Sequence, residues 1–185
     1  MITIPLRILL VEDVETDVLL TIRHLEKIIE TPHIKVVNNL DDCKRELINF
    51  VPDVVISDYN LPTCNGLEVL ELTQTTDSSI PFIFLTGAVE DEELAANTIL
   101  AGATGFVLKK NMDSLDEKLR PILKKIVFNM DSREDLRDKI RRNKIAVNQI
   151  HTYLDNIKMD NEEQKQNINK IRKNMNDLRF DDDAK

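Results

Sequence analysis

The chain has 185 residues, a formal net charge of −8 and only two cysteines, Cys43 and Cys64. This length suits one domain of ordinary size with an extension. Acidic residues interrupt the first apolar run, which excludes a signal peptide, and no run approaches the roughly 20 apolar residues of a membrane span. We therefore expect a cytoplasmic protein without a membrane segment, whose two cysteines are free thiols.

Charge and composition both change near residue 128. Residues 1–128 hold 21 acids and 12 bases, a net charge of −9, whereas residues 129–185 hold 12 acids and 13 bases, a net charge of +1. An acidic body repels nucleic-acid phosphate and the balanced tail offers no basic footprint, so we expect no nucleic-acid binding. All glycines and prolines lie at or before Pro121. We therefore expect a globular domain over 1–128 and a helical extension over 129–185.

Strand and helix patterns alternate along residues 1–128. The predicted strands are 8–11, 34–37, 54–57, 82–85 and 106–108. The predicted helices are 16–30, about 41–50, 66–74 and 91–101, and a last helix that follows a capping box of Ser114 and Glu117. Five β–α repeats with short links predict an α/β fold, a five-stranded parallel sheet doubly wound by helices in the flavodoxin-like manner.

The third predicted strand, Val54 to Ser57, leads directly into a carboxylate, Asp58. An acidic residue at the end of an apolar strand is costly to desolvate, so it reaches water or meets a cation. Loop-forming residues follow at once, which favours an exposed rim of the sheet. Taken alone, Asp58 is equally consistent with a plain turn into a loop.

Other predicted strands end in related chemistry, at the sheet edge where ligands bind in doubly wound folds. The residues at these strand ends are Glu12, Asp13, Asp58, Thr86 and Lys109. Clustered carboxylates repel one another unless a cation joins them, and oxygen ligands select a hard ion such as Mg²⁺. A lysine and a threonine hydroxyl suit phosphoryl oxygens. The pattern therefore predicts phosphoryl transfer to a carboxylate nucleophile.

Residues 6–127 resemble the receiver domain of bacterial two-component response regulators. The resemblance rests on ILLVED at 8–13, SDYNLP at 57–62, FLTGA at 84–88 and GFVLK at 105–109. The chain departs from the family pattern at Lys110, where the family usually has proline.

The resemblance implies roles for individual residues. Asp58 is the phosphoacceptor, and Glu12, Asp13, Asp58 and the main-chain carbonyl of Asn60 hold Mg²⁺. Thr86 and Lys109 take the phosphoryl oxygens, and Phe106 repacks when Thr86 moves; a core aromatic is the alternative interpretation of Phe106. The implied partner is a sensor histidine kinase or a phosphotransfer protein.

Other catalytic sites are disfavoured. No glycine-rich loop follows the first strand, Ser57 lacks the flanking glycines of a nucleophile elbow, and the three histidines have no metal-ligand spacing. We expect no enzyme activity beyond self-phosphorylation and self-dephosphorylation at an aspartate.

A heptad pattern runs through the extension from Ile140 and predicts a long C-terminal helix that forms a coiled coil. The a positions are Ile140, Val147, Leu154, Asn161, Ile168 and Met175, and the d positions are Asn143, Ile150, Ile157, Gln164, Ile171 and Leu178. We expect a homodimer through residues 132–180, with Asn161 and Gln164 as a polar layer. The alternative is a helical hairpin that breaks at Asp160.

Three functions stay open at this point. The first is a phosphorylation-controlled regulator that signals through altered dimerisation or partner docking. The second is a constitutive coiled-coil scaffold with a receiver-like body. The third is the N-terminal part of a longer regulator whose output domain is absent from this chain.

Overall fold

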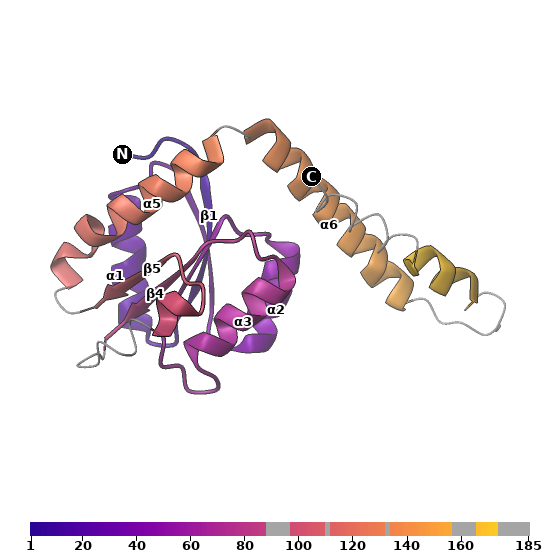
Figure 1. The fold of residues 1–185 in the computed structure, drawn as a ribbon, viewed down its shortest axis with the longest axis horizontal. Helices are drawn as coiled ribbons and strands as arrows, with labels where there is room; N and C mark the ends of the chain where they lie inside the picture. Colours follow the sequence, from indigo (N-terminus) through magenta and orange to yellow (C-terminus); the bar gives the residue numbers. More distant parts are fainter. Residues whose placement is uncertain (88–96, 110–111, 132–133, 157–165, 174–185) are drawn as a thin grey trace. The chain divides into compact units, whose positions relative to one another are not determined.

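The structure is a computed structural model, shown in Figure 1, and it describes residues 1–87, 97–109, 112–131, 134–156 and 166–173. The chain divides into two compact units, Met1–Arg137 and Asp138–Lys185. The predicted boundary at residue 128 lies inside helix α5 of the first unit. No helix of the described segments combines the length and the apolar character needed to cross a membrane.

The first unit is built on a five-stranded parallel sheet. Its strands are β1 (Leu6–Val11), β2 (Pro32–Val37), β3 (Val54–Ser57), β4 (Phe82–Thr86) and β5 (Gly105–Leu108). They lie in the order β2-β1-β3-β4-β5, and every neighbouring pair is parallel. This is the doubly wound, flavodoxin-like order, in which the connection direction reverses between β1 and β3.

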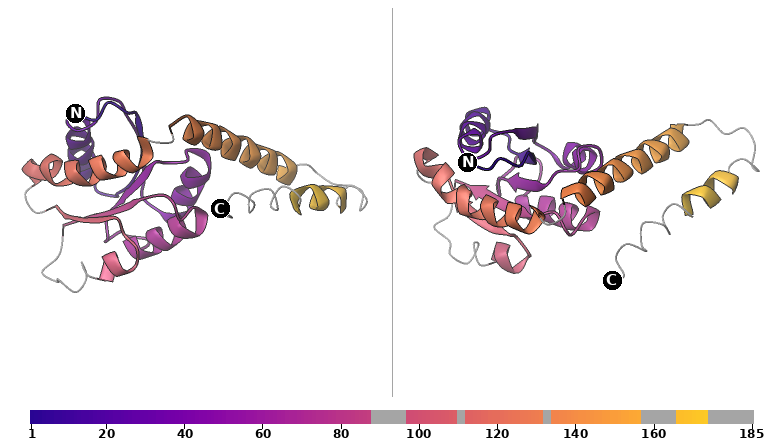
Figure 2. Two further views of the ribbon diagram at one scale, coloured as in Figure 1. Left: turned by 45° about the horizontal axis from the view of Figure 1, so that its top comes forward. Right: turned by 90° about the horizontal axis from the view of Figure 1, so that it is seen from above.

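Helices cover both faces of this sheet, as Figures 1 and 2 show. They include α1 (Glu15–Glu26), α2 (Leu40–Asn49), α3 (Gly66–Thr76) and α5 (Leu115–Asp131), the last preceded by a 3₁₀ turn, Met112–Ser114. Helices α1 and α5 lie on one face, and α2 and α3 lie on the other. Residues 97–100 are also helical, and the rest of the helix predicted over 91–101 lies outside the described residues.

Alternation along the strands divides the buried side chains between two cores. Ile8, Leu10 and Ile56 face the core beneath α1 and α5, whereas Leu9 and Val55 face the core beneath α2 and α3. Successive strand residues point to opposite faces, so strands covered on both sides are apolar at nearly every position. This is why the short run 54–57 could be recognised as a buried strand.

The predicted fold class is confirmed, and β3 has the predicted bounds. Helix α1 ends at Glu26 and not at residue 30, which corrects the helix predicted over 16–30. The reason is that Ile28 and Ile29, which continue the helical apolar pattern, are buried by the N-terminal segment instead. The backbone of Ile2 donates to Ile28 O and accepts from Glu30 N, at 2.7 and 2.9 Å.

Two helices are described in the region of the extension, α6 (Glu134–Asn156) and a helix over 166–173. Ile150 and Ile171, both predicted d positions, are 47% and 48% exposed. The polar layer predicted at Asn161 and Gln164 and the alternative break at Asp160 lie outside the described residues, and both stay predictions.

Glycine is required at position 66 because the start of α3 lies close to the backbone that follows β3 and to the ring of Phe84 on β4. A Cβ at this position would lie 2.7 Å from the carbonyl oxygen of Asp58 and 2.7 Å from Cε1 of Phe84. Gly66 N also donates to the carbonyl oxygen of Tyr59 at 2.8 Å. Asn65, just before it, forms a capping box with Glu68 that fixes the start of α3. A side chain at position 66 would therefore displace the backbone of Asp58.

We predict that Gly66→Ala lowers the free energy of unfolding by about 1–3 kcal/mol, because the new methyl group must displace backbone and a buried ring. Urea denaturation measures the change. Gly87→Ala is the matched control: its Cβ would meet only Lys109 Cδ, at 3.9 Å, so its effect should stay within about 0.5 kcal/mol. Equal effects of the two substitutions would contradict this reading of Gly66.

Candidate functional site

The register of the sheet brings three sequence-distant segments to one edge. Val11 pairs with Ser57 across β1 and β3, so Glu12 and Asp58 follow these strands side by side. Thr86 pairs with Leu108 across β4 and β5, and Lys109 N donates to Thr86 O at 2.7 Å. This edge lies at the carboxyl ends of the strands, and the β1–β3 pair is the reversal point where doubly wound folds bind ligands.

The ammonium group of Lys109 is the centre of the site. Its Nζ lies 2.6 Å from Glu12 Oε2, 2.7 Å from Asp58 Oδ2 and 2.8 Å from Asp17 Oδ2. Glu12, Asp58 and Lys109 are all buried, and the side chain of Asp17 is 28% exposed. A lysine ammonium has three N–H donors, so three carboxylates use all of them.

Burial and charge act in opposite directions on this cluster. Burial favours the neutral form of Lys109, but the hydrogen bonds that its ammonium donates to Asp17, Asp58 and Glu12 outweigh burial and hold the pKa of Lys109 above its ordinary value. Burial raises the pKa of Glu12, and the hydrogen bond from Lys109 only partly offsets this. Three carboxylates and one ammonium leave a net charge of −2, which attracts a cation.

The backbone around Asp58 is fixed on both sides. Asp58 N donates to Val11 O at 2.9 Å, and Asn60 N donates to Asp58 Oδ1 at 3.2 Å. The loop that follows is closed by a bridge between Asn60 and Asn65. One carboxylate oxygen of Asp58 is therefore held by the backbone and the other by Lys109, at the rim of the sheet.

Thr86 is fully buried, and its hydroxyl has no hydrogen-bond partner among the described residues. A buried hydroxyl without a partner is energetically unfavourable, so its presence requires an explanation, such as a role in catalysis or binding. The main chain of Thr86 is hydrogen-bonded to that of Lys109. Thr86 therefore lies at the same strand ends as Asp58 and Lys109 and carries a hydroxyl that no described residue uses.

The donor atoms at this edge fit Mg²⁺, because they are carboxylate oxygens with uncompensated negative charge. Asp13 is exposed, and no group of three or more acidic, histidine or cysteine side chains is arranged around a metal position in the described part of the chain. Mg²⁺ does not require one, since it commonly binds through one or two carboxylates and keeps several waters. Glu12 and Asp58 are the two carboxylates that would hold the ion.

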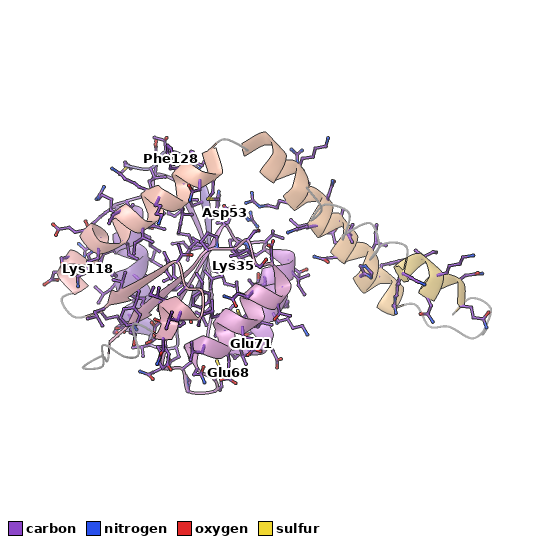
Figure 3. The ribbon with its side chains drawn as sticks, in the orientation of Figure 1. Lys35, Asp53, Glu68, Glu71, Lys118 and Phe128 are labelled. Atoms are coloured by element: carbon purple, nitrogen blue, oxygen red, sulfur yellow. The ribbon has the colours of Figure 1, made fainter. Side chains whose placement is uncertain are left out.

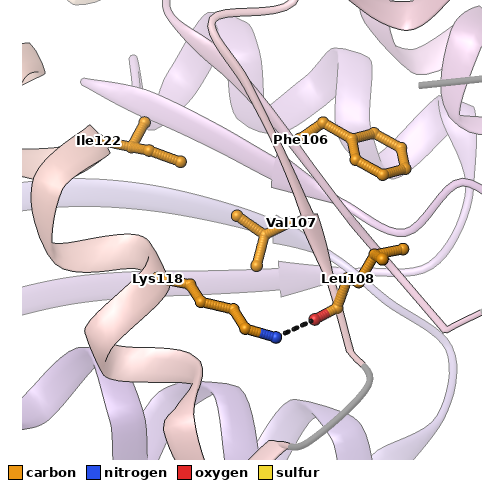
Figure 4. Close-up of a pocket in the computed structure, with 5 residues that line it drawn as sticks. All are labelled: Phe106, Val107, Leu108, Lys118 and Ile122. Carbon is orange, nitrogen blue, oxygen red and sulfur yellow. Dashed lines mark hydrogen bonds between the residues drawn. The ribbon is translucent and has the colours of Figure 1, made fainter. Parts of the chain in front are cut away.

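Phe106 lies half-buried on β5 and packs at the margin of the core beneath α2 and α3. With Val107, Leu108, Lys118 and Ile122 it lines an open hollow of about 450 Å³ between β5 and α5 (Figure 4). In this view Lys118 Nζ donates to the carbonyl oxygen of Leu108 at 3.2 Å. The hollow does not include Asp58 or its partners, so it is separate from the acidic site. Phe128, near the other end of α5, is exposed and is not part of the lining (Figure 3).

Sequence reasoning found most of this site and missed one member. Glu12, Asp58 and Lys109 are brought together as predicted, with Thr86 beside them in the sheet. Asp13 and the carbonyl of Asn60 stay predicted ligands. Asp17 was missed; the available signal was its place in the first turn of the helix after β1, which starts at the same sheet edge.

A model of the response regulator receiver domain matches residues 8–120, more than half of the chain. The chain belongs to the response regulator receiver domain family. The match spans every strand end that contributes to the acidic site, from Glu12 to Lys109. The receiver domain predicted from the sequence motifs is therefore confirmed, and the family is one whose members accept a phosphoryl group on aspartate.

Individual relatives agree with this assignment. The chain is 32% identical over 120 residues to the uncharacterized transcriptional regulatory protein YvcP of Bacillus subtilis (strain 168); the match covers 64% of this chain and 49% of YvcP, so the chain spans about half the length of that relative. A solved signal receiver domain from Vibrio parahaemolyticus has a TM-score of 0.59 at 28% identity and covers 68% of this chain and 95% of its own.

The Mn²⁺-bound form of the response regulator Rcp1 is also similar, with a TM-score of 0.51 at 22% identity, covering 64% of this chain and 91% of Rcp1. At this level of identity the likeness is one of fold alone.

We predict that Glu12→Gln raises the free energy of unfolding by about 1 kcal/mol at pH 7 without divalent ions, in the range of typical stabilising changes. The amide keeps an acceptor for Lys109 but removes a buried charge. Because folding raises the pKa of Glu12 above 4.5, its contribution to stability is complete below pH 4.5 and is lost as the pH rises through the higher folded-state pKa. The gap between the two proteins should therefore open above about pH 4.5 and close below it.

Urea denaturation across this pH range measures the gap. A variant that is less stable than the wild type at pH 7 would show that the ionised Glu12 stabilises the fold.

Proposed function

We propose that Asp58 accepts a phosphoryl group in a Mg²⁺-dependent reaction and that the chain acts as a two-component response regulator. The observation that carries the proposal is the combination at one sheet edge of Asp58, the Lys109 ammonium 2.7 Å from it, and the unpartnered hydroxyl of Thr86. These groups are a nucleophile, a cation and a hydrogen-bond donor, which is what transfer of an anionic group to a carboxylate requires.

In the transfer, one oxygen of the Asp58 carboxylate forms a bond to phosphorus, and the bond between phosphorus and the leaving group of the donor breaks. The product is an acyl phosphate on Asp58. Water later breaks the acyl phosphate and returns the carboxylate and inorganic phosphate. Beyond this self-phosphorylation and self-dephosphorylation the chain is proposed to catalyse nothing.

The chain's own residues supply charge and orientation. Lys109 redirects one hydrogen bond from Asp58 Oδ2 to a phosphoryl oxygen, and the Thr86 hydroxyl donates a hydrogen bond to another phosphoryl oxygen. Glu12, Asp13, Asp58 and the main-chain carbonyl of Asn60 would hold Mg²⁺, which when bound neutralises charge on the phosphoryl oxygens. The net charge of −2 in the Lys109 cluster and the existence of a Mn²⁺-bound form of the similar Rcp1 support a divalent ion here.

The proposed partner that delivers phosphate is a sensor histidine kinase or a phosphotransfer protein. The proposed output is altered dimerisation or partner docking through the helical extension. The exposed Ile150 and Ile171 support self-association, because a second helix would cover apolar side chains that one chain leaves in water. We propose no direct contact with nucleic acid or membrane, on the grounds of the acidic body and the balanced tail.

A second candidate comes from YvcP, a protein described as a transcriptional regulator, of which this chain spans about half the length. The receiver would then control an output domain on a longer polypeptide. A constitutive scaffold is the remaining alternative, and it requires no phosphorylation at Asp58.

We predict that incubation with Mg²⁺ and an acyl phosphate adds the mass of one phosphoryl group to the wild type and to Asp41→Asn, but not to Asp58→Asn. Asp41 is an exposed acid at the start of α2 and serves as the matched control. Intact-mass spectrometry measures the gain, and a chelator should abolish it. An unmodified wild-type chain, or a gain that persists in Asp58→Asn, would sink the proposal.

We predict that the full-length chain sediments as a dimer and that Ile150→Asp shifts it toward monomer, because a charge at a d position is desolvated in the seam. Gln149→Asp adds the same charge to an exposed residue outside the predicted seam and should leave the dimer intact. Analytical ultracentrifugation over a range of concentrations measures both. A monomeric wild type, or equal effects of the two variants, would contradict self-association through this helix.

A further inference from the structure

Asp17 stands apart from the other carboxylates that hold Lys109. It lies in the first turn of α1, whereas Lys109 follows β5, 92 positions along the chain. Its Oδ2 nevertheless lies 2.8 Å from Lys109 Nζ, within 0.2 Å of the distances from Glu12 and Asp58. The contact joins an otherwise surface-facing helix turn to the buried centre of the site.

The three carboxylates differ in what else they are proposed to do. Asp58 is the phosphoacceptor, and both Glu12 and Asp58 are among the residues that would hold Mg²⁺. Asp17 belongs to neither group. Of the three carboxylates, Asp17 is therefore the one that binds only the ammonium of Lys109, while Glu12 and Asp58 are also proposed to bind Mg²⁺ or the phosphoryl group.

Lys109 needs such a partner because its side chain is long and flexible. A lysine has a point charge on a flexible four-carbon stem, and holding it in one orientation costs side-chain entropy. A fixed acceptor on a helix pre-orders the ammonium and leaves another N–H directed at Asp58. This is how positioning groups raise the rate of a transfer without touching the reacting atoms.

We propose that Asp17 is a positioning residue that holds the Lys109 ammonium against Asp58 during phosphoryl transfer. The inference rests on the proposed phosphorylation of Asp58 and adds a sixth residue to the five predicted at the strand ends. If Asp17 acted through its charge alone, its removal would have the opposite effect on the phosphorylation rate. Removal of a negative charge near the site would favour approach of an anionic phosphodonor and would speed the reaction.

The test compares two acidic residues of the same helix turn. Glu15 is exposed and lies two positions before Asp17 in the first turn of α1, so Glu15→Ala and Asp17→Ala change net charge and helix-end electrostatics alike. Time courses of intact mass at saturating Mg²⁺ and several concentrations of acyl phosphate separate the maximal phosphorylation rate from the half-saturating donor concentration.

Asp17→Ala should lower the maximal rate by about tenfold or more, the usual scale for loss of a charged hydrogen bond. Asp17→Asn keeps an oxygen acceptor and should recover part of the rate, and Glu15→Ala should match the wild type. The half-saturating donor concentration should change little. A rate for Asp17→Ala equal to or above that of Glu15→Ala would overturn the proposal.

A second measurement separates this inference from the proposed function. Burial and hydrogen bonding slow the exchange of the Lys109 ammonium protons with water, and this exchange rate can be measured from the side-chain ¹⁵Nζ–H signal at neutral pH without phosphate. The exchange should be slow in the wild type and in Glu15→Ala and faster in Asp17→Ala, with the unfolding temperature of all three proteins compared as a check of folding. If the wild type accepts no phosphoryl group, the proposed function fails, and the exchange rate in Asp17→Ala alone decides whether Asp17 positions Lys109.

Discussion

The site depends on one ammonium group shared by three carboxylates. Lys109 Nζ lies within 2.8 Å of Glu12, Asp17 and Asp58, in a cluster whose core members are buried. One positive charge cannot compensate three negative charges, so the fold maintains a local surplus of negative charge at the sheet edge. Such a surplus is unfavourable for stability alone, and it is what a divalent cation or an incoming phosphoryl group with its cation would relieve.

The fold creates this arrangement through backbone register. Apart from Asp17, which lies in the first turn of α1, each contributing residue lies at or just beyond the end of a parallel strand, and the pairing of Val11 with Ser57 and of Thr86 with Leu108 brings these strand ends to the same level. Gly66 lets α3 start against the carbonyl of Asp58, where any side chain would collide. The positions of the reactive side chains therefore depend on main-chain hydrogen bonds and on close packing by residues that take no part in the reaction.

The sequence predicted the sheet, its helices and the main site residues because each has a local signal. Buried strands such as 54–57 are apolar at nearly every position, and the charged residue that follows this strand, Asp58, is conspicuous. The signal for Asp17, its place in the first turn of α1, is weak, because an acid in the first turn of a helix is common for reasons of helix polarity alone. The early end of α1 was missed because Ile28 and Ile29 continue the helical pattern while their burial comes from pairing with the N-terminal segment. The hydrophobic periodicity of a short segment does not reveal long-range contacts of this kind.

The central claim is that this cluster is built to bind a divalent cation beside Asp58, and calorimetric titration with Mg²⁺ at fixed ionic strength tests it most directly. The account predicts saturable binding at one site in the wild type, strong weakening in Asp58→Asn and Glu12→Gln, and unchanged binding in Asp41→Asn. Absence of binding by the wild type, or equal binding by all four proteins, would contradict it.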